Sequence, residues 1–82
     1  MLVNEAIKFI MKQKGITQQK IADMLGLVVG QRVVTNKLAT KNMTMKTALM
    51  FLDALDYELV IKPKTRGKRK EGEILITMDG EE

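Results

Sequence analysis

Residues 15–38 have the sequence GITQQKIADMLGLVVGQRVVTNKL, which contains the clearest helix signals of the chain. Thr17 can cap the start of a short helix through its hydroxyl oxygen, and Gly26 suits the left-handed position just beyond a helix end. Apolar residues then recur at helical spacing in both halves: Ile21, Ala22 and Leu25, followed by Val33, Val34 and Leu38. We therefore predict a helix-turn-helix, with helices over residues 18–25 and 31–38.

The connection between these two helices is unusually apolar, because Leu27, Val28 and Val29 fill it. Gly30 can then serve as the flexible entry to the second helix. A second interpretation starts that helix near Val28 and leaves Gly30 inside it, at a cost of about 1 kcal/mol relative to alanine. The small Ala22 is expected where the two helix backbones approach each other.

Two more helices are predicted on either side of this motif. The first covers residues 3–14, with Gly15 closing it, and carries apolar residues on one face: Val3, Ala6, Ile7, Ile10 and Met11. The other begins after a Thr44 cap and runs to about Leu55. Its expected buried residues are Met45, Ala48, Leu49, Leu52 and Leu55.

Beyond Asp56 the apolar pattern alternates, which predicts strands. Residues 57–62 form the first candidate strand, and Pro63 prevents a helix from continuing there. A second candidate strand covers 73–78, with 65–72 as the hairpin loop. Because two strands alone are marginal in water, the hairpin is expected to pack on the helices or pair with a second copy. The predicted fold is mainly α, a four- to five-helix domain with a C-terminal β-hairpin.

The residue inventory argues against an enzyme. The chain has 82 residues, without cysteine, histidine or serine, so thiolate, imidazole and serine chemistry and the usual zinc sites are excluded. Asp53 and Asp56 lie at helical spacing, as solvated surface charges do. There is no glycine-rich phosphate loop. We expect no cofactor and no metal, and the absence of a long apolar run or signal-peptide pattern predicts no membrane association.

Charge is the positive clue to function. The formal net charge is +4, and residues 1–40 hold six lysines and arginines against two carboxylates. A second, acid-free basic cluster follows, made of Lys64, Arg66, Lys68, Arg69 and Lys70. The tail from Glu71 is acidic. A basic region beside a helix-turn-helix is typical of a protein that binds a polyanion.

The span from about Val3 to Lys64 resembles the phage-repressor-like (Cro/repressor, XRE-type) helix-turn-helix family. The resemblance rests on GITQQKIA at 15–22 with Gly26, and on LDYELVIKPK at 55–64, where the last helix runs directly into a strand. It implies a cytoplasmic regulator of a bacterial or phage-infected cell that binds double-stranded DNA as a homodimer. The expected organisation is a DNA-binding domain over 1–56, a hairpin over 57–78 and an acidic tail over 79–82. The apolar content of both candidate strands and the small core favour the hairpin as the dimerisation element.

The resemblance also implies which residues contact DNA. The second helix of the motif would enter the major groove, where the expected base contacts are Gln31, Arg32, Thr35 and Asn36. The expected phosphate contacts are Thr17, Gln18, Lys37 and Lys41. Accessory DNA contacts are expected from Arg66, Lys68, Arg69 and Lys70. The chain departs from the family in its turn, which is about two residues longer, so the start of the groove-entering helix stays open.

A different class of function is also compatible with this sequence. Some members of the same fold act as antitoxins or otherwise bind a protein partner. Here Val28, Val29 or the hairpin would hold that partner.

Overall fold

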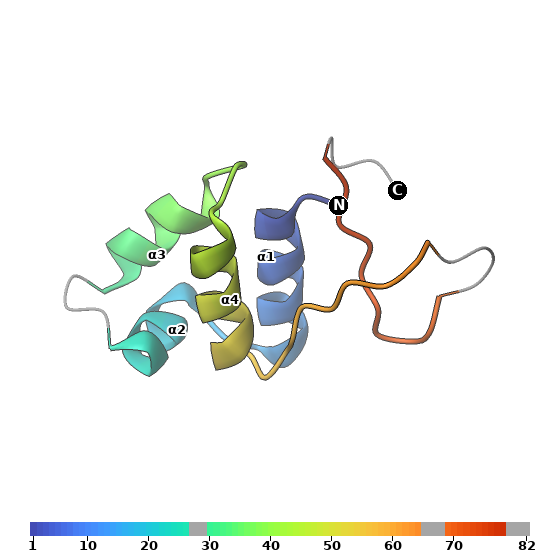
Figure 1. Cartoon of the computed structure of the whole chain (residues 1–82). Helices are drawn as coiled ribbons and strands as arrows, with labels where there is room; N and C mark the ends of the chain where they lie inside the picture. The colour runs from blue at the N-terminus through green and yellow to red at the C-terminus, as the bar shows by residue number, and fades with distance from the viewer. Residues whose placement is uncertain (27–29, 65–68, 79–82) are drawn as a thin grey trace.

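The computed structural model describes residues 1–26, 30–64 and 69–78 of the chain, which contain four helices (Figure 1). The helices are α1 (Val3–Lys14), α2 (Gln18–Leu25), α3 (Gln31–Leu38) and α4 (Met45–Ala54). The four predicted helices are therefore confirmed. The alternative that leaves Gly30 inside the helix is wrong, because Gly30 has φ 66° and ψ −144°, which is not helical, and caps α3 from outside. Leu27, Val28 and Val29, on which the apolar turn and the alternative helix start were predicted, lie outside the described residues.

The helix ends have the chemistry that the sequence predicts. The Thr17 hydroxyl accepts a hydrogen bond from the backbone N–H of Lys20 at 3.1 Å, and the Thr44 hydroxyl accepts one from Thr47 at 3.2 Å. Gly15 and Gly26 end α1 and α2 in the left-handed conformation. These caps satisfy backbone groups that a helix end leaves without intrahelical partners.

The four helices enclose one aliphatic core. In Figure 1, α4 stands between α1 and α2, and it packs on both. Ala22 is fully buried in the interior, as expected for a small residue where helices approach. The largest fully buried side chains are Phe51, Ile7, Ile10, Ile21, Leu38, Leu55 and Val34.

The predicted buried face of α4 is partly wrong. Met45 is 61% exposed and Leu49 is 44% exposed, whereas Phe51 is completely buried. Ala48, Leu52 and Leu55 are buried as predicted. Each residue turns a helix by about 100°, so burial of Phe51 in place of Met45 and Leu49 rotates the buried face away from the predicted stripe. The bulky Phe51 points into the core, which moves Met45 and Leu49 to its edge.

The C-terminal arm, defined as residues 57–64 and 69–78, runs along one end of the helical core. Its described residues form no strand, so the predicted hairpin is not confirmed. The backbone of the second segment bonds elsewhere: Thr77 donates to the carbonyl of Met1 at 3.1 Å, and the Met1 amino group donates to the Leu75 carbonyl at 3.2 Å. The two segments of the arm are joined instead by a salt bridge, with 2.7 Å between Lys62 Nζ and Glu73 Oε1.

The described molecule is elongated, with extents of 43 × 23 × 18 Å. Figure 1 shows α3 at one end and the arm at the other, with α1 and α4 between them. Tyr57 and Ile74 attach the arm by packing against the core. None of the helices has the length and apolar character needed to cross a membrane, as judged over the part of the chain described.

Candidate nucleic-acid interface

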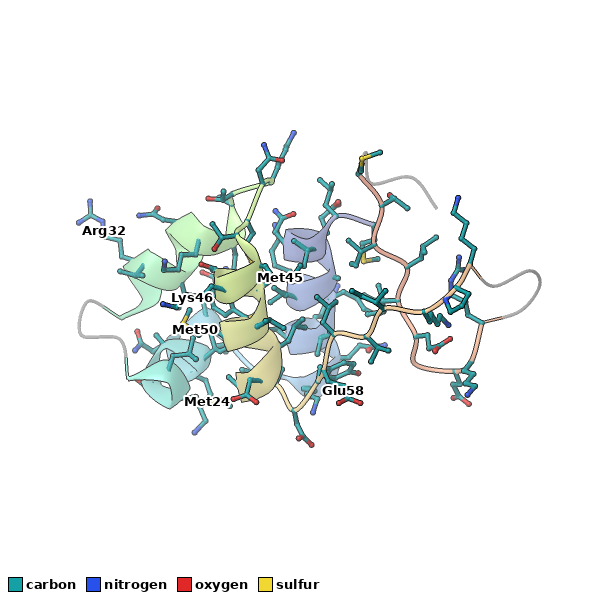
Figure 2. All side chains as sticks on the ribbon, viewed as in Figure 1. Met24, Arg32, Met45, Lys46, Met50 and Glu58 are labelled. Atoms are coloured by element: carbon teal, nitrogen blue, oxygen red, sulfur yellow. The ribbon has the colours of Figure 1, made fainter. Side chains whose placement is uncertain are left out.

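One face of α3 is buried and the opposite face is open. Val34 and Leu38 lie in the core, at 0% and 1% exposure. Arg32, Thr35 and Asn36 are exposed, and Figure 2 shows Arg32 projecting outward from the end of the molecule. Gln31 is the first residue of α3, and its side chain lies outside the described part of the structure. The buried pair therefore holds the helix while the polar residues remain accessible.

The start of α2 lies against this open face. Gln18, half-buried at the first position of α2, accepts a hydrogen bond through its side-chain oxygen from the Thr35 hydroxyl. The bond joins a predicted phosphate contact to a predicted base contact. Thr17 precedes Gln18 as the cap of α2, so its hydroxyl is already engaged with the backbone of Lys20.

Positive charges follow α3 into the next helix. Lys37 is half-buried, and Lys41 is exposed in the turn after α3. Lys46, which the sequence analysis did not select, is exposed in the first turn of α4, and Figure 2 shows it on the side of α4 that faces α2 and α3. The signal that could have identified it is its position two residues after the Thr44 cap.

The charge of α3 and the start of α4 is positive, because this part of the sequence contains no acidic residue. The sequence contains no Asp or Glu between Asp23 and Asp53, while Arg32, Lys37, Lys41 and Lys46 all lie within that interval. Four cations in a segment without carboxylates attract phosphate groups and repel cations, although exposed Asp23 on α2 accepts a hydrogen bond from Gln19 beside the start of α3. The α3 face, defined as the exposed residues of α3 with the start of α2, is therefore suited to a polyanion.

The predicted accessory contacts lie elsewhere. Arg69 and Lys70 are exposed on the arm, and the arm is at the opposite end from α3 (Figure 1). Arg66 and Lys68 lie outside the described residues. The structure thus does not bring Arg69 and Lys70 together with the base-contacting candidates.

Among the described residues, a groove is present and a cluster of metal-ligating side chains is not. Within them, no group of three or more His, Cys, Asp or Glu side chains is placed to hold a metal ion. A groove of about 290 Å³ separates α1 from the arm, and its lining is largely apolar, including Val3, Ile10 and Ile74. This groove is suited to an apolar side chain or molecule.

Comparisons with protein-family models, curated proteins and solved structures found no match for this chain. Function is therefore inferred from the geometry and charge of the α3 face.

Proposed function

We propose that this protein is a sequence-specific DNA-binding regulator of transcription, of the repressor-like helix-turn-helix type, that acts on double-stranded DNA in a bacterial or phage-infected cell. The observation that carries the proposal is the α3 face. It presents Arg32 and Asn36 on a helix anchored by buried Val34 and Leu38, in a stretch of sequence without acid.

The chemistry of base recognition follows from these side chains. The major groove of B-DNA admits an α-helix, and α3 has the required polar face. Arg32 can donate two parallel hydrogen bonds to guanine, and Asn36 or Gln31 can bond adenine in the same way. Each such pair contributes about 1–3 kcal/mol of discrimination against the wrong base.

Phosphate contacts fix the orientation of the protein on the duplex. Thr17 and Gln18 at the start of α2, with Lys37 and Lys41 after the exposed part of α3, are the proposed contacts. We add Lys46, because it is exposed on the same side of α4. Each phosphate that a lysine neutralises releases condensed counterions, which makes binding depend on salt.

We further propose that the protein acts as a homodimer and that the arm is its dimerisation element, with its two segments pairing as strands in the dimer. Large apolar side chains of the arm support this proposal: Val60 is 66%, Ile61 99% and Met78 101% exposed. Since a two-fold dimer repeats each contact, the operator would contain two half-sites about one helical turn apart.

The decisive experiment is selection of bound sequences from random double-stranded DNA. The proposal expects a reproducible palindromic motif, with an affinity that falls steeply as salt rises. Binding that depends on salt but has no sequence preference would contradict a specific regulator.

The same exposed residues support a second candidate function, an antitoxin or other protein-binding role. An arm with Ile61 fully exposed beside an apolar groove is a surface that another protein can cover. Co-purification of a stoichiometric partner that protects the arm from proteolysis, together with the absence of a selected DNA motif, would favour this function.

A further inference from the structure

Asn4 is the single buried polar side chain among the described residues, at 5% exposure on the core face of α1. Its side-chain amide nitrogen donates a hydrogen bond to the backbone carbonyl of Leu38 at 2.9 Å. Leu38 is the last residue of α3. The bond therefore crosses from the first helix of the chain to the end of the proposed DNA-contacting helix.

The acceptor of this bond is a carbonyl that needs a partner from outside its helix. The last four carbonyls of an α-helix have no intrahelical donor, and a buried one is costly to leave unpaired. Leu38 itself is 1% exposed. Asn4 thus supplies the hydrogen bond that the Leu38 carbonyl, buried away from solvent, needs at the end of α3.

The helix so held is short, with eight residues. Two side-chain hydrogen bonds join its described residues to other helices: Thr35 to Gln18, on the exposed side, and Asn4 to Leu38, in the core. The first holds the middle of α3 against α2, and the second holds its carboxyl end against α1. Apolar packing of Val34 and Leu38 has no fixed direction, whereas two separated hydrogen bonds oppose rotation of α3 about its own axis.

Asn4 also has a free-energy cost of burial that an apolar residue at the same position would not have. Its side-chain oxygen is buried and has no hydrogen-bond partner among the described residues. Burying an unpaired polar atom is unfavourable, and leucine has nearly the same shape without that atom. What Asn4 contributes is the N–H group that donates to the Leu38 carbonyl, because a hydrogen bond fixes a direction and apolar packing does not.

We infer that Asn4 is a positioning residue for DNA recognition: by fixing the carboxyl end of α3, it sets the depth and rotation at which Arg32 and Asn36 meet the bases. This inference rests on the proposed DNA-binding function. It concerns the difference between specific and non-specific binding, since non-specific binding depends mainly on charge and tolerates a small rotation of the helix.

The test compares Asn4→Leu with Ile10→Val. Both positions are buried on α1, but Ile10 lies toward the arm groove, so its variant controls for a general loss of core stability. Affinity for the selected DNA motif and for random DNA of equal length would be measured at a temperature where unfolding curves show each variant fully folded. Asn4→Ala, which removes the amide without overfilling the site, is the second variant if Asn4→Leu does not fold.

We expect the ratio of specific to random affinity to fall roughly tenfold in the Asn4 variants, the scale of one weakened base contact, and to stay unchanged in Ile10→Val. The backbone amide signals of α3 should also shift in free Asn4 variants, which does not require DNA. An unchanged ratio would overturn the inference while leaving the regulator proposal intact. Failure of the wild-type protein to select any motif would instead remove the proposed function itself.

Discussion

We expect the guanidinium group of Arg32 to contribute most of the discrimination between DNA sequences. Arg32→Ala should lose preference for the selected motif with an unchanged helical circular dichroism spectrum, because the residue is exposed on α3. Arg32→Lys is the sharper variant, since lysine keeps the charge but lacks the planar pair of donors that fits guanine. It should keep the salt dependence of binding and lose about 1–3 kcal/mol of discrimination, measured with single-base variants of the motif. If Arg32→Lys discriminates as well as the wild type, Arg32 does not contact a base.

Glu73 gives the arm a pH dependence. The hydrogen bond from Lys62, and next the backbone N–H of Lys70, hold the pKa of the Glu73 carboxyl below its ordinary value of 4.5. Because the folded pKa is the lower one, the contact stabilises the arm above the unfolded pKa and is lost as pH falls through the folded pKa. Lys62→Met should raise the pKa of Glu73, as followed by NMR titration of its carboxyl carbon. The same titration in Lys46→Met, which leaves the arm intact, should match the wild type.

At the scale of elements, the turn between α2 and α3 depends on Gly30. Its φ of 66° with ψ of −144° belongs to a region that residues with a Cβ rarely adopt. Among the described residues an added Cβ would meet only the Gln19 amide, at 3.8 Å, so the cost expected for Gly30→Ala is backbone strain and not collision with them. We expect a loss of about 1–3 kcal/mol in the free energy of unfolding by denaturant.

The matched control is Gly26→Asn, because Gly26 has the ordinary left-handed conformation, with φ 66° and ψ 30°, that asparagine tolerates. A smaller loss in Gly26→Asn than in Gly30→Ala would support the assignment of strain to Gly30. Equal losses would mean that φ alone, and not the unusual ψ of Gly30, determines the cost.

The helices were predictable because their signals are local. Thr17, Thr44 and the glycines at 15 and 26 mark helix ends through bonds that span only a few residues. The direction of α4 about its axis was not predictable in the same way, since burial of Phe51 in preference to Leu49 depends on how three other helices fill the core. The predicted hairpin is not confirmed for a related reason: the backbone of Leu75 and Thr77 bonds to Met1, far away in sequence.

In the candidate site, too, local features could be predicted from the sequence and contacts between helices could not. Exposed polar residues of α3 could be selected from periodicity, because Val34 and Leu38 define the opposite face. The hydrogen bonds that hold this face could not be predicted from periodicity, because they join different helices: Thr35 to Gln18, and Asn4 to the Leu38 carbonyl. Lys46 was missed because α4 follows the motif, and it is the packing of α4 on α2 that turns this side of α4 toward α2 and α3.

Over the molecule as a whole, the α3 face and the arm are separated. The α3 face lies at one end, and the arm, which carries the highly exposed Val60, Ile61 and Met78, lies at the other (Figure 1). This arrangement allows one end to bind DNA while the other binds a second copy, without competition between the two surfaces. Dimerisation can then strengthen DNA binding, since two linked half-site contacts act together.

Ile61→Lys tests this division of roles. Ile61 is 99% exposed, so the substitution should leave the folding of the protomer unchanged while placing a charge in the proposed interface. A two-fold interface contains the change twice, and burial of each isoleucine contributes about 1.5 kcal/mol or more, so we expect the dimer Kd to rise on the order of a hundredfold in sedimentation equilibrium. Met45→Lys, at a 61% exposed position on α4, is the control and should keep the wild-type Kd. If both variants associate as the wild type does, the arm is not the dimer interface, because a lysine ammonium cannot be buried there without a large desolvation cost.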